Sequence, residues 1–251
     1  MDLGLAGKIA LVTGSSRGIG CTIAKTLHRE GCCLALNGRS DAALGNTALA
    51  LGERCSIHVA DVTRPEDCRK LIAAVMQRWG RLDILVCNVG SGDSVPPGHE
   101  NAAEWHRVLA LNLLSATNMV EAARPYLRPS HGTIVCISSI CGLQTLGAPV
   151  TYSGAKAALN AYVRGMARPL GGEGIRIVAV APGNVFFQGG TWDKKLHNDR
   201  AAVTAMLDSQ VALKRFGTPE EVGDIVAFLA SPRAAFITGT IIVADGGQIC
   251  T

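Results

Sequence analysis

Short apolar runs alternate with longer stretches of helical periodicity from one end of the chain to the other. Fully apolar strands separated by helices are typical of a parallel sheet that helices cover on both faces. The pattern predicts strands at Lys8–Thr13, Cys33–Asn37, Ser56–Ala60, Ile84–Cys87, Thr133–Ser138, Ile175–Ala181 and Thr240–Ala244. It predicts helices at Ile19–Glu30, Glu66–Trp79, Glu104–Leu127, Ala155–Leu170 and Glu220–Leu229.

This alternation continues without a linker, a repeat or a low-complexity tract, so we expect one doubly wound α/β domain over residues 1–251. One helix start is marked clearly, because Thr218-Pro219-Glu220-Glu221 supplies a capping Thr, a Pro at the first position and a Glu at N3. The one long irregular stretch, residues 183–214, contains Gly189-Gly190. Long irregular segments inside compact domains are usually functional, so we expect a substrate lid there.

The composition excludes several classes of protein. Hydrophobic residues make up 48% of the 251 residues, mean hydropathy is +0.24 and the net charge is only +4, which favours collapse over disorder. Apolar runs such as Ile225–Ala230 are far shorter than the ~20 residues of a membrane helix. The charges are scattered rather than clustered, which argues against a nucleic-acid partner. The first residues lack a secretory pattern, so we expect a cytoplasmic protein.

The nine cysteines do not form a recognisable disulfide or metal pattern. Their number is odd, there is no CxxC, and Cys32, Cys33, Cys87 and Cys136 lie in apolar runs. We expect reduced thiols that act as small hydrophobic residues. Zinc would need two close ligand pairs, and no Cys/His spacing supplies them, so we expect no metal site.

A glycine-rich turn connects the first predicted strand to the first predicted helix. Its spacing is GxxxGxG, and such a turn lets the backbone approach a pyrophosphate that the N–H groups of the helix N-terminus then bind. The loop lacks GK[ST] and is not a Walker loop. The candidate cofactor-binding residues here are Gly14, Ser15, Ser16, Arg17, Gly18, Ile19 and Gly20.

The end of the second strand indicates which dinucleotide is bound. An acidic residue at this point would bind a free ribose 2′-hydroxyl, but the sequence has Gly38 followed by Arg39. Arg17 is a second cation that could reach the same place, and Arg binds phosphate through two parallel hydrogen bonds. These residues favour NADP(H) over NAD(H), the alternative being that Arg39 is only a solvated loop residue.

Tyr152 and Lys156 lie four residues apart in a helical stretch and therefore project from one face. An ammonium group beside a Tyr stabilises tyrosinate and lowers its pKa from about 10 toward working pH, as general acid–base catalysis requires. Ser139 ends a strand shortly before this pair. With the glycine loop upstream, we expect these three residues to form a catalytic site.

Taken together, these motifs resemble the short-chain dehydrogenase/reductase (SDR) family over nearly the whole chain. The resemblance also includes Asp61-Val62, Asn88-Val89-Gly90, Asn112, Pro182-Gly183 and Asp245-Gly246-Gly247. It implies a Rossmann fold with a parallel sheet of about seven strands. The 3-oxoacyl-(acyl-carrier-protein) reductase-like branch is most similar, through Ser16–Gly20 and Arg215–Glu221.

The resemblance also implies residue roles. Tyr152 would donate a proton to the substrate carbonyl oxygen, Ser139 would orient that oxygen, Lys156 would bind the nicotinamide ribose and lower the pKa of Tyr152, and Asn112 would position a water. Cofactor contacts are implied for Asp61, Val62, Asn88, Gly90, Tyr152, Lys156, Pro182, Gly183 and Val185.

Two positions depart from the family pattern. The usual Asn-Asn-Ala-Gly is Cys87-Asn88-Val89-Gly90 here, and the Thr common five residues after Pro182 is Phe187. Because that Thr often contacts the carboxamide, cofactor contacts in this loop differ from the family pattern.

The substrate is left open by the sequence. Relatives that serve an acyl carrier protein tend to have basic residues where this chain has Ser130 and Glu173, and a carboxylate facing an acidic partner is unfavourable, although Arg128 could partly substitute. In the lid, Phe186, Phe187 and Trp192 lie among charged residues. They either hold a bulky or anionic carbonyl compound or simply pack the lid down.

The expected function is that of an NADPH-dependent oxidoreductase that interconverts a ketone and a secondary alcohol, with a 3-oxoacyl thioester as one candidate substrate. An NAD-dependent sugar, polyol or hydroxysteroid dehydrogenase is the alternative. A non-catalytic cofactor-binding regulator is less favoured, because such proteins typically lose the Tyr or the Lys. By family resemblance we expect a homotetramer and a small-molecule substrate.

Overall fold

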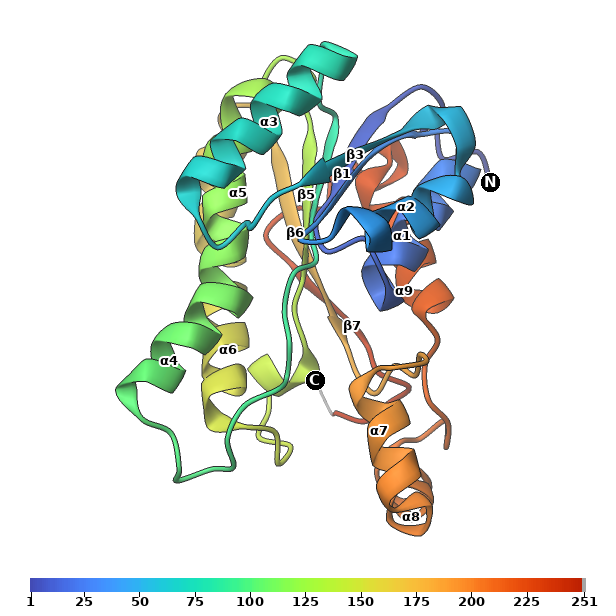
Figure 1. The fold of residues 1–251 in the computed structure, drawn as a ribbon, viewed down its shortest axis with the longest axis vertical. Helices are drawn as coiled ribbons and strands as arrows, with labels where there is room; N and C mark the ends of the chain where they lie inside the picture. Colours follow the sequence, from blue (N-terminus) through green and yellow to red (C-terminus); the bar gives the residue numbers. More distant parts are fainter. Residues whose placement is uncertain (250–251) are drawn as a thin grey trace.

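Seven parallel strands form one sheet in the order β3-β2-β1-β4-β5-β6-β7 (Figure 1). The computed structural model describes residues 1–249. The strands are β1 Ile9–Val12, β2 Cys33–Gly38, β3 Cys55–Val59, β4 Ile84–Cys87, β5 Thr133–Ile137, β6 Arg176–Pro182 and β7 Ile241–Ala244. All seven predicted strands are confirmed. The inner strands β1, β4 and β5 are buried along their whole length, as expected for a sheet covered on both faces.

Helices cover both faces of the sheet in two layers (Figure 1). Their bounds are α1 Gly18–Arg29, α2 Asp41–Leu49, α3 Pro65–Trp79, α4 Ala102–Leu109, α5 Ser115–Leu127, α6 Val150–Gly171, α7 Thr191–Asn198, α8 Arg200–Gln210 and α9 Pro219–Ala230. One hydrophobic cluster joins α1, α2 and α9 to the sheet, and a second joins α3, α5 and α6 to the opposite face.

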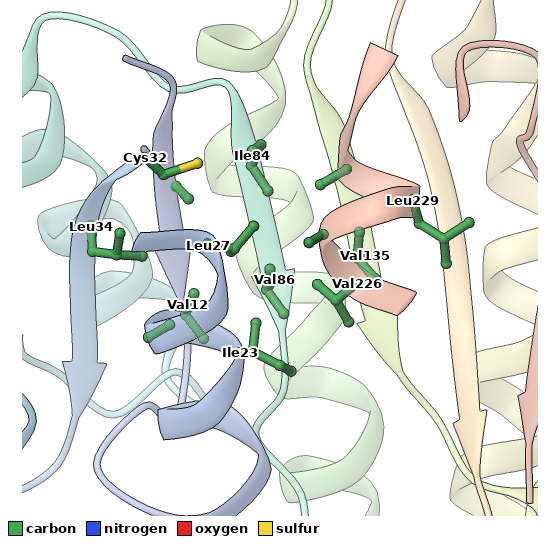
Figure 2. Packing of buried hydrophobic residues seen from close by; sticks show 14 of the residues in the cluster. Val12, Ile23, Leu27, Cys32, Leu34, Ile84, Val86, Val135, Val226 and Leu229 are labelled. Carbon is green, nitrogen blue, oxygen red and sulfur yellow. The ribbon is translucent and has the colours of Figure 1, made fainter. Parts of the chain in front are cut away.

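The packing of α1 against α9 is the centre of the first layer (Figure 2). Ile23 and Leu27 of α1 and Val226 of α9 lie over Val12 and the neighbouring strands, and all are fully buried. Each such side chain contributes about 1.5–3 kcal/mol when it leaves water. This packing fixes the start of α1, and therefore the glycine loop, relative to the sheet.

The chain reverses its direction of winding between β1 and β4. β1 pairs with β2 on one side and with β4 on the other, and the connections from these two strands diverge. In open α/β sheets, ligands bind at this switch point, outside the carboxyl ends of the strands. The loops that follow β1, β4, β5 and β6 therefore form the candidate site.

Two predicted helical features are confirmed or refined. At the start of α9, Thr218 Oγ1 accepts from the Glu221 N–H at 3.3 Å while Glu221 Oε2 accepts from the Thr218 N–H at 2.8 Å, a complete capping box. The single helix predicted over Glu104–Leu127 is instead α4 and α5, joined by a π-helical segment at Ala110–Leu114. Such segments are frequent at functional sites, and this one contains Asn112.

The lid, residues 183–214, differs from its prediction. An irregular segment was expected, but α7 and α8 occupy most of it. At its base the lid is tied to the body, because Phe186 donates to the Gly217 carbonyl at 3.0 Å and Gly217 donates to the Asn184 carbonyl at 2.9 Å. Figure 1 shows α7 and α8 projecting beyond the end of β7.

Eight cysteines lie in the described part of the chain, and all are free thiols, as predicted. The ninth, Cys250, lies outside the described residues. Within residues 1–249, no group of three potential ligands could hold a metal ion. None of the helices described there combines the length and the apolarity that crossing a bilayer requires.

Candidate active site

The glycine loop folds tightly at the start of α1. Gly14 and Gly18 have φ angles of +64° and +54°, which favour glycine. A Cβ on Gly20 would lie 2.4 Å from the Gly14 carbonyl oxygen, so this position has no room for a side chain. Asn88 Nδ2 donates to the carbonyl oxygens of Thr13 at 3.0 Å and Gly14 at 3.2 Å, which ties the loop to the end of β4.

This loop fits a dinucleotide pyrophosphate. Among the described residues, no side chain caps the first N–H groups of α1, so these donors are available to an anion. The glycines leave the backbone open to close approach. Ser15 of this loop is fully buried, and its Oγ accepts a hydrogen bond from the Asn37 N–H at 3.0 Å. The residues predicted to surround the pyrophosphate are therefore brought together at one helix N-terminus.

Two cations act on Asp61, in the region where the sequence predicts the adenine end of the cofactor. Burial would raise the pKa of Asp61, but hydrogen bonds from Thr63 and the charges of Arg39 and Arg64 hold it below its ordinary value. Arg39, directly after β2, is therefore close enough to act on this carboxylate. Arg64 is a second cation here that the sequence analysis did not identify, because it precedes α3 without a motif.

The side chain of Arg17 contacts the lid. Its Nη1 atom is 3.4 Å from the Gly189 carbonyl oxygen, so in this structure the side chain is directed toward the lid. That Arg17 reaches the same place as Arg39 when a cofactor is bound stays a prediction.

Ser139, Tyr152 and Lys156 come together where β5 ends and α6 begins. Ser139 is buried and caps the short helix Ile140–Gly142, with its Oγ 3.2 Å from the Cys141 nitrogen. A hydrogen bond joins Ser139 to Tyr152. Lys156 Nζ donates to the Ile137 carbonyl at 2.8 Å and lies 5.9 Å from the ring centroid of Tyr152.

The pKa values of this pair differ from the expectation. Burial raises the pKa of Tyr152 to about 12, although its hydrogen bond with Ser139 acts in the opposite direction. Burial also lowers the pKa of Lys156 to about 8. The predicted lowering of the Tyr152 pKa by Lys156 is therefore absent in this state, because desolvation dominates both groups.

Asn112 is held inside the π-helical segment. Its Oδ1 accepts from the Ser91 N–H at 2.9 Å, and its Nδ2 donates to the carbonyl oxygens of Ser91 and Val108, both at 3.1 Å. The amide group is therefore occupied in fixing the segment that follows β4. A Cβ on Gly90 would lie 2.8 Å from Asn112 Oδ1 and 3.1 Å from Lys156 Nζ, so glycine allows these two residues to approach the loop.

Gly142 is a site residue that the sequence analysis missed. A Cβ built there would lie 2.6 Å from the Lys156 carbonyl carbon and 2.8 Å from the Ala157 nitrogen. Its carbonyl accepts from Asn160 Nδ2 at 3.1 Å, and Asn160 Oδ1 accepts from Ser138 at 2.6 Å. These contacts dock α6 onto the turn after Ser139. No motif marks such an approach between distant backbones.

The end of β6 and the residues after it are tightly packed; they include Pro182, Gly183 and Val185. Gly183 donates to the Ala244 carbonyl at 2.9 Å, and a Cβ on it would lie 2.7 Å from the Cβ of Asp245. Val185 is buried and pairs with Gly217. The Asp61-Val62 pair lies after β3, with Val62 buried, so the predicted cofactor residues follow the ends of successive strands.

Two aromatic residues of the lid pack against Phe216, which follows the lid in the chain. The ring centroids of Phe186 and Trp192 lie 5.8 Å and 5.4 Å from that of Phe216. Lys195 lies over Trp192, with its Nζ 4.5 Å from the ring centroid. This arrangement agrees with the packing alternative for Phe186 and Trp192.

Comparison with known proteins gives matches along the whole chain. A family model described as enoyl-(acyl carrier protein) reductase matches residues 14–248. The 3-oxoacyl-[acyl-carrier-protein] reductase of Vibrio cholerae is 32% identical over 247 residues, covering 98% of this chain and 99% of that protein.

Solved structures also match this chain over nearly its whole length. The L-sorbose reductase from Gluconobacter frateurii, complexed with NADPH and L-sorbose, has a TM-score of 0.94 at 30% identity and covers 100% of both chains. A 7α-hydroxysteroid dehydrogenase complexed with NADH and 7-oxo glycochenodeoxycholic acid has a TM-score of 0.91 at 26% identity, covering 99% and 96%. These proteins reduce or oxidise different substrates on one fold.

Proposed function

Because this chain belongs to the short-chain dehydrogenase/reductase family, an oxidoreductase family acting on CH–OH and carbonyl groups, we propose that it interconverts a ketone and a secondary alcohol with NADP(H) and with Tyr152 as the general acid/base. The observation that carries this proposal is the meeting of Tyr152, Ser139 and Lys156 beside the glycine loop.

Each residue has a definite task in this proposal. When bound, the nicotinamide supplies or accepts a hydride. Tyr152 gives its proton to the carbonyl oxygen, and Ser139, already bonded to Tyr152, orients that oxygen. Lys156 binds the ribose and holds positive charge beside Tyr152. Asn112 would position a water of the proton relay, and its side-chain amide is held by Ser91.

The preference for NADP(H) rests on the charge at the adenine end. Arg39 and Arg64 both act on Asp61, and no carboxylate ends β2. A 2′-phosphate would add an anion beside these guanidinium groups. L-sorbose reductase, a close structural neighbour, is complexed with NADPH, whereas the hydroxysteroid dehydrogenase is complexed with NADH. NAD(H) is therefore the alternative.

Reduction of a 3-oxoacyl thioester is the first substrate class we propose. Relatives about one third identical along the whole chain are 3-oxoacyl-[acyl-carrier-protein] reductases. Glu173, which argued against carrier docking, is paired with Arg124 through two hydrogen bonds, and Arg128 also acts on it. The cluster of two arginines and one glutamate is therefore net positive, which weakens the argument against an acidic partner.

A sugar, polyol or steroid substrate is the second candidate class. L-sorbose reductase covers the whole chain at 30% identity, and the hydroxysteroid dehydrogenase shares the same fold. A non-catalytic regulator is the least supported alternative, because Ser139, Tyr152 and Lys156 are all present, with Ser139 hydrogen-bonded to Tyr152.

We also propose a homotetramer in the cytoplasm. Paired contacts would involve the helices that carry Asn112 and Tyr152 and the edge strand β7. Phe236, just before β7, is fully exposed in the single chain, which supports a covered surface there. Light scattering at micromolar concentration tests the assembly, and a monomeric mass would contradict it.

The experiment that tests the function is oxidation of NADPH and NADH against a carbonyl panel. The panel contains an acetoacetyl thioester, diketones, keto sugars and ketosteroids. We expect turnover with NADPH for at least one class and none with Tyr152→Phe. No turnover with any compound of the panel, together with tight NADPH binding in wild type and in Tyr152→Phe, would favour the non-catalytic regulator.

A further inference from the structure

The ring of Phe187 crosses from the lid to the glycine loop. A Cβ built on Gly18 would lie 2.7 Å from Cε2 and 2.8 Å from Cζ of this ring, so the ring rests directly on the Gly18 backbone. A Cβ on Gly190 would lie 3.0 Å from the same two ring atoms. The ring is therefore held between two glycines, one in the loop and one in the lid, and neither position has room for a side chain.

The rest of the lid base is anchored independently of this contact. Residues 184–186 pair with Gly217, and Leu213 donates to the Gly246 carbonyl at 3.0 Å. Phe186, the neighbouring aromatic residue, packs on Phe216. Phe187 and the Arg17–Gly189 contact at 3.4 Å are thus two points at which the lid meets the glycine loop.

The position of the ring matters because of what Gly18 does. Gly18 is the first residue of α1, where N–H groups are directed at a bound anion. An apolar ring at this point excludes water, and electrostatic interactions are stronger where water is excluded. A pyrophosphate bound at this loop would therefore lie next to the ring.

We propose that Phe187 is a cofactor-retaining residue whose ring closes the glycine loop and slows release of the dinucleotide. The inference rests on the proposed function, since it requires that a dinucleotide binds this loop. The Phe187 ring would close the loop by its bulk, where the Thr common in relatives makes a polar contact. This role agrees with glycine at positions 18 and 190, which both lie against the ring.

The rate of NADPH release tests this proposal without any substrate. NADPH bound to the protein is displaced by excess NADP⁺ in a stopped-flow instrument, and loss of the bound-state fluorescence is followed. For Phe187→Ala we expect release about tenfold faster than in wild type, which corresponds to about 1.4 kcal/mol. Phe187→Leu, which keeps apolar bulk, should release NADPH at a rate between those of wild type and Phe187→Ala.

Phe186→Ala is the matched control. It removes a neighbouring ring of the lid that packs on Phe216, so we expect its release rate to stay within about twofold of wild type. The thermal midpoints of the free proteins show that all variants are folded.

Two results would overturn the proposal. One is an unchanged release rate in both Phe187 variants. The other is equal acceleration in Phe186→Ala, which would assign the effect to general loosening of the lid. A wild-type protein that binds neither NADPH nor NADH would contradict the proposed function itself, and that outcome is distinct because it is seen before any variant is compared.

Discussion

Lys156 donates its hydrogen bond to the main-chain oxygen of Ile137 rather than to Tyr152. The Nζ–O distance is 2.8 Å, whereas Nζ lies 5.9 Å from the centre of the Tyr152 ring. An almost fully buried ammonium group is thus held by one carbonyl, and burial lowers its pKa to about 8. The site keeps this Lys close to Tyr152 at a cost in stability.

Replacement of Lys156 by Met should therefore stabilise the fold while abolishing activity. The shift of the Lys156 pKa from 10.5 to about 8 corresponds to a destabilisation of about 3 kcal/mol, at about 1.4 kcal/mol per pKa unit. Loss of the hydrogen bond to Ile137 would cost about 1 kcal/mol of this gain. We expect a net gain of about 2 kcal/mol at pH 7, measured by urea unfolding.

The pH dependence of that gain follows from the direction of the shift. The pKa of Lys156 is depressed in the folded state, so the penalty is fully present below pH 8. Above pH 8, Lys156 loses its proton in the folded protein but keeps it in the unfolded chain. The free-energy penalty of burying the charged Lys156 therefore shrinks as the pH rises toward 10.5. The difference between Lys156→Met and wild type should narrow across this window. A difference that grows with pH would contradict the account.

The value of kcat/KM for reduction should fall at alkaline pH, where Lys156 loses its charge. The pKa of Tyr152 is about 12, so its proton is available through the accessible range, whereas the charge on Lys156 is lost near pH 8. We expect kcat/KM for reduction to be constant below pH 8 and to fall about tenfold per unit above it. In Lys156→Arg this fall should disappear, because a guanidinium stays charged. A flat wild-type profile up to pH 10 would contradict this assignment.

Gly142→Ala should damage both the fold and the site. Its Cβ would enter the backbone of α6 at Lys156 and Ala157, so the helix must shift away from Ser139. We expect a loss of about 1–3 kcal/mol in the free energy of unfolding and at least about a tenfold lower kcat.

The control for that substitution is Gly45→Ala. Gly45 lies inside α2, and a Cβ there would meet no atom within 4 Å. A gain of about 0.5–1 kcal/mol is expected, with unchanged kcat. Equal effects of the two substitutions would show that the approach of Gly142 to α6 has no special role.

The seven strands of the parallel sheet could be predicted from the sequence, because buried parallel strands produce apolar runs in the local pattern. Glu104–Leu127 was predicted as one helix, since a π-helical segment retains helical periodicity. The prediction failed at the lid, where α7 and α8 lie at the surface and bury few apolar residues. Few buried positions leave little periodic pattern to detect.

Within the site, residues that belong to local motifs were identified and residues that act through distant contacts were not. Gly142 matters because of α6, which arrives later in the chain. Arg64 follows Asp61 closely in the same turn and was missed because it belongs to no motif. The pKa of Tyr152 was expected to fall beside Lys156, but desolvation depends on burial that spacing alone does not give.

Arg39→Asp should reverse the cofactor preference. A carboxylate after β2 would repel a 2′-phosphate and could bind a free 2′-hydroxyl instead. We expect the ratio of kcat/KM for NADPH over NADH to fall at least about tenfold. Arg64→Ala should lower the ratio by less, because only one of two cations is lost and no carboxylate is added. An unchanged ratio in Arg39→Asp would contradict NADP(H) as the cofactor selected by this residue.

The most direct test of the central claim follows the hydride and the proton donor together. Wild type and Tyr152→Phe are each incubated with NADPH deuterated at the transferring position and with the carbonyl compound found active in the panel, and the product alcohol is analysed by mass spectrometry. We predict one deuterium on the carbinol carbon with wild type and no labelled alcohol with Tyr152→Phe, while NADPH affinity stays within about twofold. Deuterium transfer by Tyr152→Phe at the wild-type rate would contradict the assignment of Tyr152 as the acid.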